Sequence, residues 1–298
     1  MEKKRKKEEI HEPVLVKEVL RTFKVKDKKG LKIIDATLGT GGHTLELVNN
    51  GAQVLGIELD PEILEVAKKR LKGAKNYKLF LGNFKDIDSI AADFGLGNVD
   101  GVLFDLGVSN LQLRDRFRGF SFEYPSADLD MRISSRVQGI KAMDLVNVLR
   151  KDQLERLFLQ VLDYSEAKKI AQRIIERRIS RPFEKVADFL EVSKVARVSK
   201  RNNPSTRAFL ALRIAVNSEL ENLEVALPKS FSILKKGGRL CVISFHSSED
   251  RIVKNYFRSL VQKEKGFLVT KKVIRPTLSE VQKNKRSRSA KLRAVEKL

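Results

Sequence analysis

The chain has 298 residues, of which 42% are hydrophobic, so it can form a core in one large domain or two smaller ones. Its single Cys excludes a disulfide framework and a Cys-rich zinc module, and favours a reducing compartment, for which the cytoplasm is the default. A net charge of +22, from 60 Lys and Arg against 38 Asp and Glu, favours a polyanionic partner, nucleic acid first. Residues 1–9 are nearly all charged, and no apolar run reaches the roughly 18 residues that span a bilayer. We therefore expect a soluble protein without a signal peptide.

Residues 31–107 alternate between apolar runs and amphipathic stretches. Four strands are predicted in the segments LKIIDA, AQVLGIELD, KLFLGN and VDGVLFDLG. A glycine-rich turn and a helix follow the first strand, and a second helix begins at Pro61 and ends near Gly73, where Pro and Gly suit helix ends. This alternation predicts an α/β fold with a doubly wound, Rossmann-like parallel sheet.

The strand pattern is interrupted between residues 113 and 212. Segments such as AMDLVNVLRKDQLERLFLQVL and EAKKIAQRIIERRI place apolar residues three to four positions apart, which is typical of helices. One long helix is predicted over residues 207–234, followed by KKGG as a turn and RLCVISF as the next strand. We therefore expect a discontinuous α/β domain, 1–112 and 213–298, with an all-helical domain inserted at 113–212. The final segment, 261–298, carries 12 Lys and Arg against 3 Asp and Glu.

The turn after the first strand contains Gly39, Gly41 and Gly42. A backbone without Cβ atoms can approach a ligand closely, as in nucleotide cofactor loops. The spacing is not the G-x-G-x-x-G of dinucleotide folds, and no Gly-Lys-Ser/Thr follows, which argues against NAD and against a P-loop. Glu58, at the end of the second strand, is suited to accept hydrogen bonds from both hydroxyls of a ribose, and Asp60 is the alternative if the strand ends later. The pattern predicts adenosine binding.

S-adenosylmethionine fits this loop because it carries no phosphate and needs no Lys there. Its amino acid portion needs polar groups at strand ends, and the turn from Asp105 to Ser109 supplies them after the fourth strand. Open α/β sheets bind ligands at this carboxyl edge. Phe84, after the third strand, is a candidate to pack on the adenine, with an ordinary core aromatic as the alternative.

Six sequence blocks occur in order along the chain: DATLGTGGHT, DGVLFDLGVSNLQL, RGFSF with DLDMR, STRAFLALRIAVNSELENL, SFHSSEDRIVK and RSRSAKLR. Together with HEPVL near the N-terminus, they resemble the bacterial ribosomal RNA small-subunit methyltransferase H family, formerly called the MraW family. The chain departs from the family pattern at Asn203, Ser248 and Lys285, where we would expect His, Leu and Pro. These departures bear on substrate contacts.

The resemblance implies methylation of the exocyclic N4 of a cytidine in the decoding centre of 16S ribosomal RNA, with S-adenosylmethionine as cofactor and the small ribosomal subunit as partner. It also implies that the insertion recognises the substrate. From the loop and the resemblance together, the predicted cofactor-binding residues are Gly39, Gly41, Gly42, His43, Glu58, Phe84, Asp105 and Gln112.

The reaction requires the N4 lone pair in line with the methyl group and an acceptor for the N4 proton. Asp105 is the first candidate for that acceptor, and the other predicted catalytic residues are Asn110 and His246, with Ser109 as a further helper. Asp105 has a rival role, fixing the amino group of the cofactor. Amino methyltransferases often carry Asp/Asn-Pro-Pro-aromatic at this strand end, whereas this chain has Asp-Leu-Gly-Val, so the acceptor stays open.

Charged and aromatic residues alternate just after the fourth strand, at Arg116, Arg118, Phe120 and Phe122. This alternation is typical of surfaces that bind phosphates and stack bases, with a structural hairpin as the alternative. Further phosphate contacts are predicted at Arg197, Lys200, Arg201, Arg207, Arg286 and Arg288.

Four other functions compete with this interpretation. A hydrolase built on His246 lacks a G-x-S-x-G elbow, and a metal enzyme is disfavoured because the three His residues are scattered. A DNA or small-molecule methyltransferase is disfavoured by the resemblance and by the basic final segment. The main alternative is a noncatalytic RNA-binding or ribosome-assembly factor on a methyltransferase scaffold. No heptads or other self-association signals occur, so the oligomeric state is open.

Overall fold

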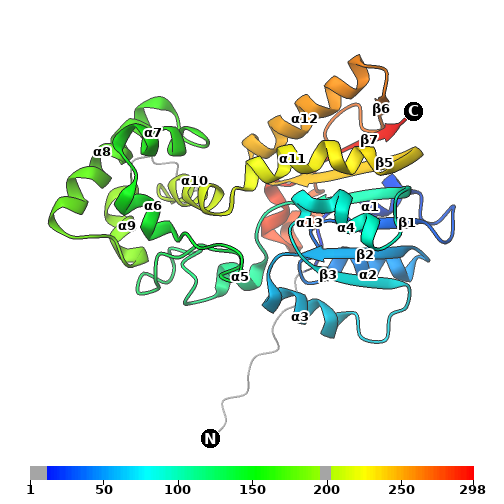
Figure 1. Ribbon diagram of the computed structural model, residues 1–298, viewed down its shortest axis with the longest axis horizontal. Coiled ribbons are helices and arrows are strands. Elements are labelled where there is room, and N and C mark those ends of the chain that lie inside the picture. The colour runs from blue at the N-terminus through cyan, green and yellow to red at the C-terminus, as the bar shows by residue number, and fades with distance from the viewer. Residues whose placement is uncertain (1–11, 195–202) are drawn as a thin grey trace, which may run out of the picture. The chain divides into compact units, whose positions relative to one another are not determined.

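The computed structural model describes residues 12–194 and 203–298, and its described part contains a seven-stranded sheet in the order β3-β2-β1-β4-β5-β7-β6 (Figure 1). The strands are β1 (Lys32–Asp35), β2 (Gln53–Glu58), β3 (Tyr77–Leu81), β4 (Val99–Asp105), β5 (Leu234–Ser244), β6 (Gly266–Leu268) and β7 (Lys291–Lys297). Strands β1 to β5 pair in parallel, whereas β7 runs antiparallel to both β5 and β6. The predicted α/β class is confirmed.

Buried side chains alternate between the two faces of the sheet. On β4, Val102 and Phe104 belong to one apolar cluster and Leu103 to another, because successive residues of a strand point to opposite faces. The first cluster is completed by the helices α4 (Ile87–Asp93), α11 (Glu219–Ser232) and α12 (Ser247–Gln262). The second is completed by α1 (Val16–Phe23) and α2 (Gly42–Asn49). Helices therefore cover both faces, as a doubly wound sheet requires.

Two compact units make up the structure. The first consists of the chain up to Ser109 together with Leu223–Leu298, and the second of Asn110–Asn222. The predicted insertion, 113–212, would have cut the helices α5 (Asn110–Arg114) and α10 (Thr206–Asn217). The observed division keeps both of these helices whole in the second unit, and at its other end it falls within α11, between Asn222 and Leu223.

In the part that the structure describes, the second unit is built from helices. Besides α5 and α10 it contains α6 (Ala142–Val148), α7 (Lys151–Leu159), α8 (Tyr164–Ser180) and α9 (Val186–Ser193). Its core is aromatic: the rings of Phe158 and Phe189 stack with centroids 6.3 Å apart, and Phe209 lies 5.0 Å from Phe189. Fully buried rings of this kind dominate the energetics of a small core.

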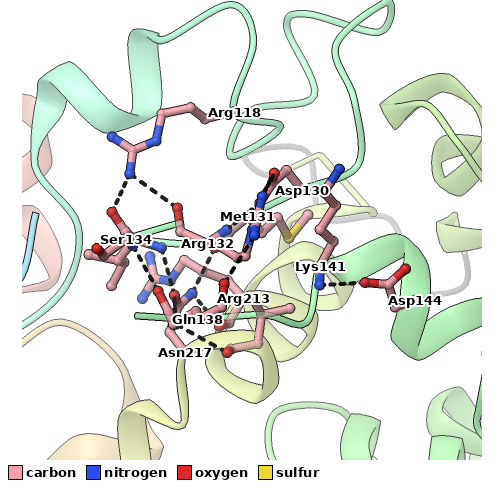
Figure 2. A network of polar contacts seen from close by, with 12 residues as sticks. Arg118, Asp130, Met131, Arg132, Ser134, Gln138, Lys141, Asp144, Arg213 and Asn217 are labelled. Atoms are coloured by element: carbon pink, nitrogen blue, oxygen red, sulfur yellow. Dashed lines mark hydrogen bonds and ion pairs between the residues drawn. The ribbon is translucent and has the colours of Figure 1, made fainter. Parts of the chain in front are cut away.

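A buried amide organises the long loop between α5 and α6 (Figure 2). Asn217 Oδ1 accepts hydrogen bonds from Ile133 N at 2.9 Å and from Gln138 Nε2 at 2.7 Å, while its Nδ2 donates to Met131 O at 2.8 Å. Arg132 forms a forked pair with Asp130, at 2.7 and 2.8 Å. The network joins two of the sequence blocks, DLDMR and the end of α10, and it holds Met131 in the left-handed region at a φ of 63°.

Two local predictions were wrong. The single helix over 207–234 is two helices, α10 and α11, separated by Ser218 at a φ of 47°. The KKGG turn lies within β5, where the register jumps from Leu234 opposite Val99 to Arg239 opposite Gly101. The basic final segment, for which the sequence pattern predicted no elements, forms β6, α13 (Leu278–Lys283) and β7, and its two strands belong to the sheet.

Within the two described ranges, no helix combines the length and the apolar character needed to cross a membrane.

Candidate functional site

The glycine-rich turn connects β1 to α2 at the carboxyl edge of the sheet. Gly39 and Gly41 have positive φ values of 53° and 78°, and Gly41 caps α2. A Cβ at Gly41 would lie 3.3 Å from Leu71 Cδ1, and one at Gly42 would lie 3.1 Å from three atoms of Pro13. These two glycines therefore serve packing within the protein. A Cβ at Gly39 would meet only Thr37 O at 3.8 Å among the described atoms, so only this glycine retains the predicted close approach to a ligand.

Glu58 closes the turn from the neighbouring strand. It is the last residue of β2, and its Oε2 accepts a hydrogen bond from Gly39 N at 2.9 Å while Oε1 accepts one from Asp60 N at 2.8 Å. Burial raises the pKa of Glu58 to about 7. The alternative residue, Asp60, instead caps α3 (Pro61–Arg70) by accepting a hydrogen bond from Glu62 N. The strand end therefore favours Glu58 as the ribose acceptor.

Two carboxylates flank a buried His at the same edge. His43, in the first turn of α2, places Nε2 3.3 Å from Asp105 Oδ2 at the end of β4. Asp35, at the end of β1, accepts a hydrogen bond from Thr44 Oγ1 at 2.8 Å. Thr37 joins the two strands, since its N donates to Asp35 Oδ1 and its Oγ1 accepts from Asp105 N at 2.6 Å.

The charges of this cluster are coupled. Burial alone lowers the pKa of His43, but the adjacent Asp105 and the nearby Asp35 outweigh it and raise that pKa above its ordinary value. Burial raises the pKa of Asp35, although His43 and Thr44 oppose the rise. The imidazolium form of His43 is therefore stabilised by two carboxylates, and its contact with Asp105 orients that side chain.

Asp105 has capacity for one further donor. Its Oδ1 is buried and has no hydrogen-bond partner in the described part of the chain. A buried acceptor without a partner is costly, so it indicates a ligand group with an N–H or O–H. The open side of Gly39, the Glu58 carboxylate and Asp105 Oδ1 together fit an adenosine-containing ligand with a primary amine.

Phe84 lies in a 3-10 helix, Phe84–Asp86, that follows β3. Its ring meets Phe104 edge-on, with centroids 5.5 Å apart, and is only partly buried. Phe84 is thus anchored on the core while part of its ring stays accessible, as an adenine contact requires.

His246 was predicted as a catalytic helper, and the structure gives it another role. It caps α12: its Nδ1 accepts from Glu249 N at 3.5 Å, and its Nε2 lies 3.1 Å from Glu249 Oε1. Both ring nitrogens therefore face Glu249, which argues against proton transfer by His246. Asn110, another predicted catalytic residue, and Gln112, a predicted cofactor-binding residue, lie on α5 in the second unit, where Gln112 is buried.

Three of the four residues predicted to form a stacking surface after β4 make contacts within the protein. Phe120 is only 6% exposed, and Phe122 packs edge-on against Phe209 with centroids 5.8 Å apart. Arg118 donates from Nη2 to the carbonyl groups of Arg132 and Ile133, which is a structural role (Figure 2). These residues therefore belong to a packed, irregular loop between α5 and α6, in which the described structure contains no strands of a hairpin.

Arg116 is exposed and lies over the ring of Tyr124. Its neighbour Phe117 is 82% exposed and is an exposed aromatic residue that the sequence analysis did not identify. The only signal for its exposure is that it lies in a segment without a helical or strand pattern.

The remaining predicted phosphate contacts divide into three groups. Arg207 donates to Glu166 Oε2 at 2.7 Å and to Val161 O at 2.6 Å, so it stabilises the second unit. Arg286 and Arg288 are exposed on a 3-10 helix, Lys285–Ser289, of the first unit. Arg197, Lys200 and Arg201 lie outside the described residues.

Sequence reasoning also missed three polar residues of the site: Asp35, Thr37 and Thr44. All three lie within the DATLGTGGHT block. The signal for these residues is a cluster of polar side chains directly after a buried strand. The sequence analysis assigns the ligand-binding role of this turn to its glycines alone.

Comparisons with known proteins identify the family to which the chain belongs. Residues 8–298 match the model of a family described as the MraW methylase family. A protein from Coprothermobacter proteolyticus called ribosomal RNA small subunit methyltransferase H is 42% identical over 290 residues, which cover 96% of each chain. Proteins of the same name from Dictyoglomus thermophilum and Pseudothermotoga lettingae are 40% and 42% identical over 97% of this chain, and cover 97% and 99% of their own lengths.

Proposed function

Because the chain belongs to the MraW methylase family, it is a methyltransferase that uses S-adenosylmethionine, and we propose that it methylates the exocyclic N4 of a cytidine in 16S ribosomal RNA. The observation that carries the proposal is Asp105, whose Oδ2 faces His43 while its buried Oδ1 has no partner in the described residues. We propose the decoding centre as the location of the cytidine, as the family resemblance implies. A ribosomal substrate also implies that the protein works in the cytoplasm.

Residues of the first unit would hold the cofactor. Glu58, fixed by the N–H groups of Gly39 and Asp60, retains lone pairs for the ribose hydroxyls. Phe84 offers its accessible ring edge to the adenine, and Gly39 leaves room for close approach of the backbone. When bound, S-adenosylmethionine supplies an electrophilic methyl group on a sulfonium.

The protein's part of the chemistry is orientation and proton acceptance. The lone pair of a cytidine N4 is delocalised into the ring, and an acceptor that takes an N4–H hydrogen bond increases its nucleophilicity. Asp105 Oδ1 is a suitable acceptor, since the His43 pair fixes the carboxylate from the other side. Holding the reacting atoms in line and excluding water supplies most of the remaining rate enhancement.

We propose that the second unit recognises the RNA. The target amine is otherwise used in base pairing, so the cytosine must be unpaired and outside its stack when it reacts. We also propose that the assembled small subunit, rather than free RNA, is the substrate, because a folded setting can present such a nucleotide. The net charge of +22 supports an RNA partner, and its binding should weaken steeply with salt.

The test is transfer of a tritiated methyl group from labelled S-adenosylmethionine to small subunits that lack the modification, followed by nucleoside analysis. Label in N4-methylcytidine is the expected result, and label in any other nucleoside would contradict the proposal. Naked 16S ribosomal RNA is the matched substrate control, and equal labelling of RNA and subunits would contradict the preference for the subunit.

A noncatalytic assembly factor is the remaining alternative. Calorimetry with S-adenosylmethionine and with S-adenosylhomocysteine distinguishes it, because a scaffold that has lost catalysis is expected to bind neither. The described site argues against such a loss, since Glu58, His43 and Asp105 are present and mutually positioned.

A further inference from the structure

A shallow hollow on the second unit is lined by cations and by no acidic residue. It has a volume of about 440 Å³ and lies on α8, with Lys151 contributed by α7. Its other basic residues are Lys168, Lys169 and Arg173, and Tyr164 stands at its edge.

Helical spacing gathers these side chains on one stripe of α8. Ser165, Lys168, Lys169, Gln172 and Arg173 recur at intervals of three and four, whereas Ile170, Ala171 and Ile174 are buried on the opposite side. The amphipathic helix therefore uses its apolar face for the core and presents a face of cationic and neutral residues outward as far as Arg173, beyond which Glu176 is exposed.

Three arginines elsewhere in this unit are neutralised by carboxylates. Arg132, Arg177 and Arg213 each lie within 2.7 Å of a carboxylate oxygen, of Asp130, Asp188 and Glu219 respectively. By contrast, none of the four cations of the hollow forms an ion pair with a residue in the described ranges, and Arg173 donates only to Lys194 O at 3.4 Å. One turn further along α8, Glu176 accepts a hydrogen bond from Gln172 rather than from a cation.

Tyr164 adds a surface for stacking. It is the first residue of α8 and 66% of it is exposed, although Tyr is a residue that usually buries its ring at least in part. An exposed ring beside a groove of unpaired cations is the combination with which proteins bind single-stranded nucleic acid: the cations contact phosphates and a base stacks on the ring.

We propose that this α7–α8 surface, formed by Lys151, Tyr164, Lys168, Lys169 and Arg173, binds a single-stranded segment of the substrate RNA. This proposal rests on the proposed function and adds to it a contact surface outside the methyl-transfer site. The phosphates lie on the Lys and Arg side chains, and one base stacks on Tyr164.

The first test measures the affinity for a labelled single-stranded RNA oligonucleotide as a function of salt concentration. The double variant Lys168→Ala/Lys169→Ala removes two contacts, so the slope of log K against log salt should fall by about 1.4 and the affinity at 0.1 M salt by roughly 20-fold. The matched control is Lys72→Ala/Lys75→Ala, which removes two exposed charges from the loop between α3 and β3, at the amino edge of the sheet. The control should keep the wild-type slope, and an unchanged slope in the α8 variant would overturn the proposal.

The second test separates stacking from charge. Tyr164→Ala should weaken RNA binding at least about fivefold at constant salt slope, while Tyr164→Phe keeps the ring and should bind like the wild type. Thermal unfolding of all variants checks that the second unit is folded. If the α8 variants bind RNA normally but lose affinity for intact subunits, the surface contacts a ribosomal protein and the proposal is wrong.

Methyl transfer by the wild-type protein keeps the two proposals apart. If the wild type labels subunits while the α8 variant binds RNA normally, only the surface proposal fails. If the wild type transfers no methyl group, the proposed function fails, and the salt slopes still report on the surface.

Discussion

His43 and Asp105 meet at the carboxyl edge of the sheet, with 3.3 Å between Nε2 and Oδ2. The first belongs to the helix that follows β1 and the second ends β4, so the pair connects the glycine-rich turn to the neighbouring strand. The charge of Asp35 also contributes to the raised pKa of this imidazole. The orientation of the Asp105 carboxylate is therefore set by residues that do not need to contact the substrate.

Asp105→Ala should reduce methyl transfer strongly, by roughly 10²- to 10⁴-fold, because the proton acceptor is lost. Steady-state turnover on small subunits measures this, and calorimetry with S-adenosylhomocysteine separates the two roles of the residue. Unchanged affinity for the cofactor product would indicate that Asp105 accepts the proton of the cytidine N4. A large loss of that affinity would indicate that Asp105 binds the amino group of the cofactor. Asp105→Asn is the isosteric control for packing, and wild-type turnover in both variants would remove Asp105 from the mechanism.

His43→Ala should lower the free energy of unfolding by about 3 kcal/mol at pH 6, because Asp35 and Asp105 lose the cation between them. The folded-state pKa of His43 lies above its unfolded value of 6.5. Its charge therefore stabilises the fold fully below pH 6.5, and this contribution is lost as the pH rises through the folded pKa. Urea unfolding at pH 6 and pH 9 should give a smaller difference from the wild type at pH 9. A difference that grows with pH would contradict the assignment.

The stabilisation that Glu58 contributes should also decrease as the pH rises, as for His43, but over a lower pH range. The variant Glu58→Gln tests this. The pKa of Glu58 rises from 4.5 to about 7 on folding, so its stabilisation is complete below pH 4.5 and lost by about pH 7. The stability of the wild type relative to Glu58→Gln should therefore fall by up to about 3 kcal/mol between pH 4.5 and pH 8. Unfolding midpoints across this range test it, and a pH-independent difference between the two proteins would show that Glu58 titrates normally.

Gly119→Ala should destabilise the second unit by about 3 kcal/mol or more, because the residue has a positive φ and its Cβ would strike a backbone carbonyl. The φ is 70°, and the added Cβ would lie 2.2 Å from Asp128 O. Gly139→Ala is the matched control, since a Cβ there meets nothing within 4 Å of the described structure. Thermal unfolding compares the two variants, and equal midpoints would contradict the predicted clash.

The parallel core of the sheet could be predicted from the sequence because its strands are continuous apolar runs. Strand β7 could not, since Arg293 and Glu296 interrupt its apolar residues. The structure explains both charges: Arg293 pairs with Asp250 at 2.8 Å, and Glu296 pairs with Arg239 of the adjacent β5 at 2.7 Å. Ion pairs between residues that are distant in the sequence cannot be predicted from the local pattern of apolar residues. The charges of β7 therefore hid its character as a strand.

The site was predictable only where its signal is local. The glycine-rich turn and Glu58 follow from their positions at strand ends, which periodicity identifies. The contact between His43 and Asp105 depends on the order of β1 and β4 in the sheet. The stacking surface was misjudged because the alternation of Arg and Phe after β4 is compatible with both a surface and a packed loop, and the burial of Phe120 was decided by tertiary packing.

The position of β7 between β5 and β6 has a consequence for biosynthesis. During translation, residues 291–297 are synthesised well after β5 and its other neighbour, β4. The N–H and C=O groups on the β7 side of β5 therefore have no strand partner until β7 is synthesised. The second unit, whose residues precede β5, can acquire its core earlier, since domains generally fold as units during synthesis. A nascent chain stalled before Lys291 would therefore expose an unpaired strand edge that can pair with other chains, and this edge is where ribosome-bound chaperones would be expected to bind.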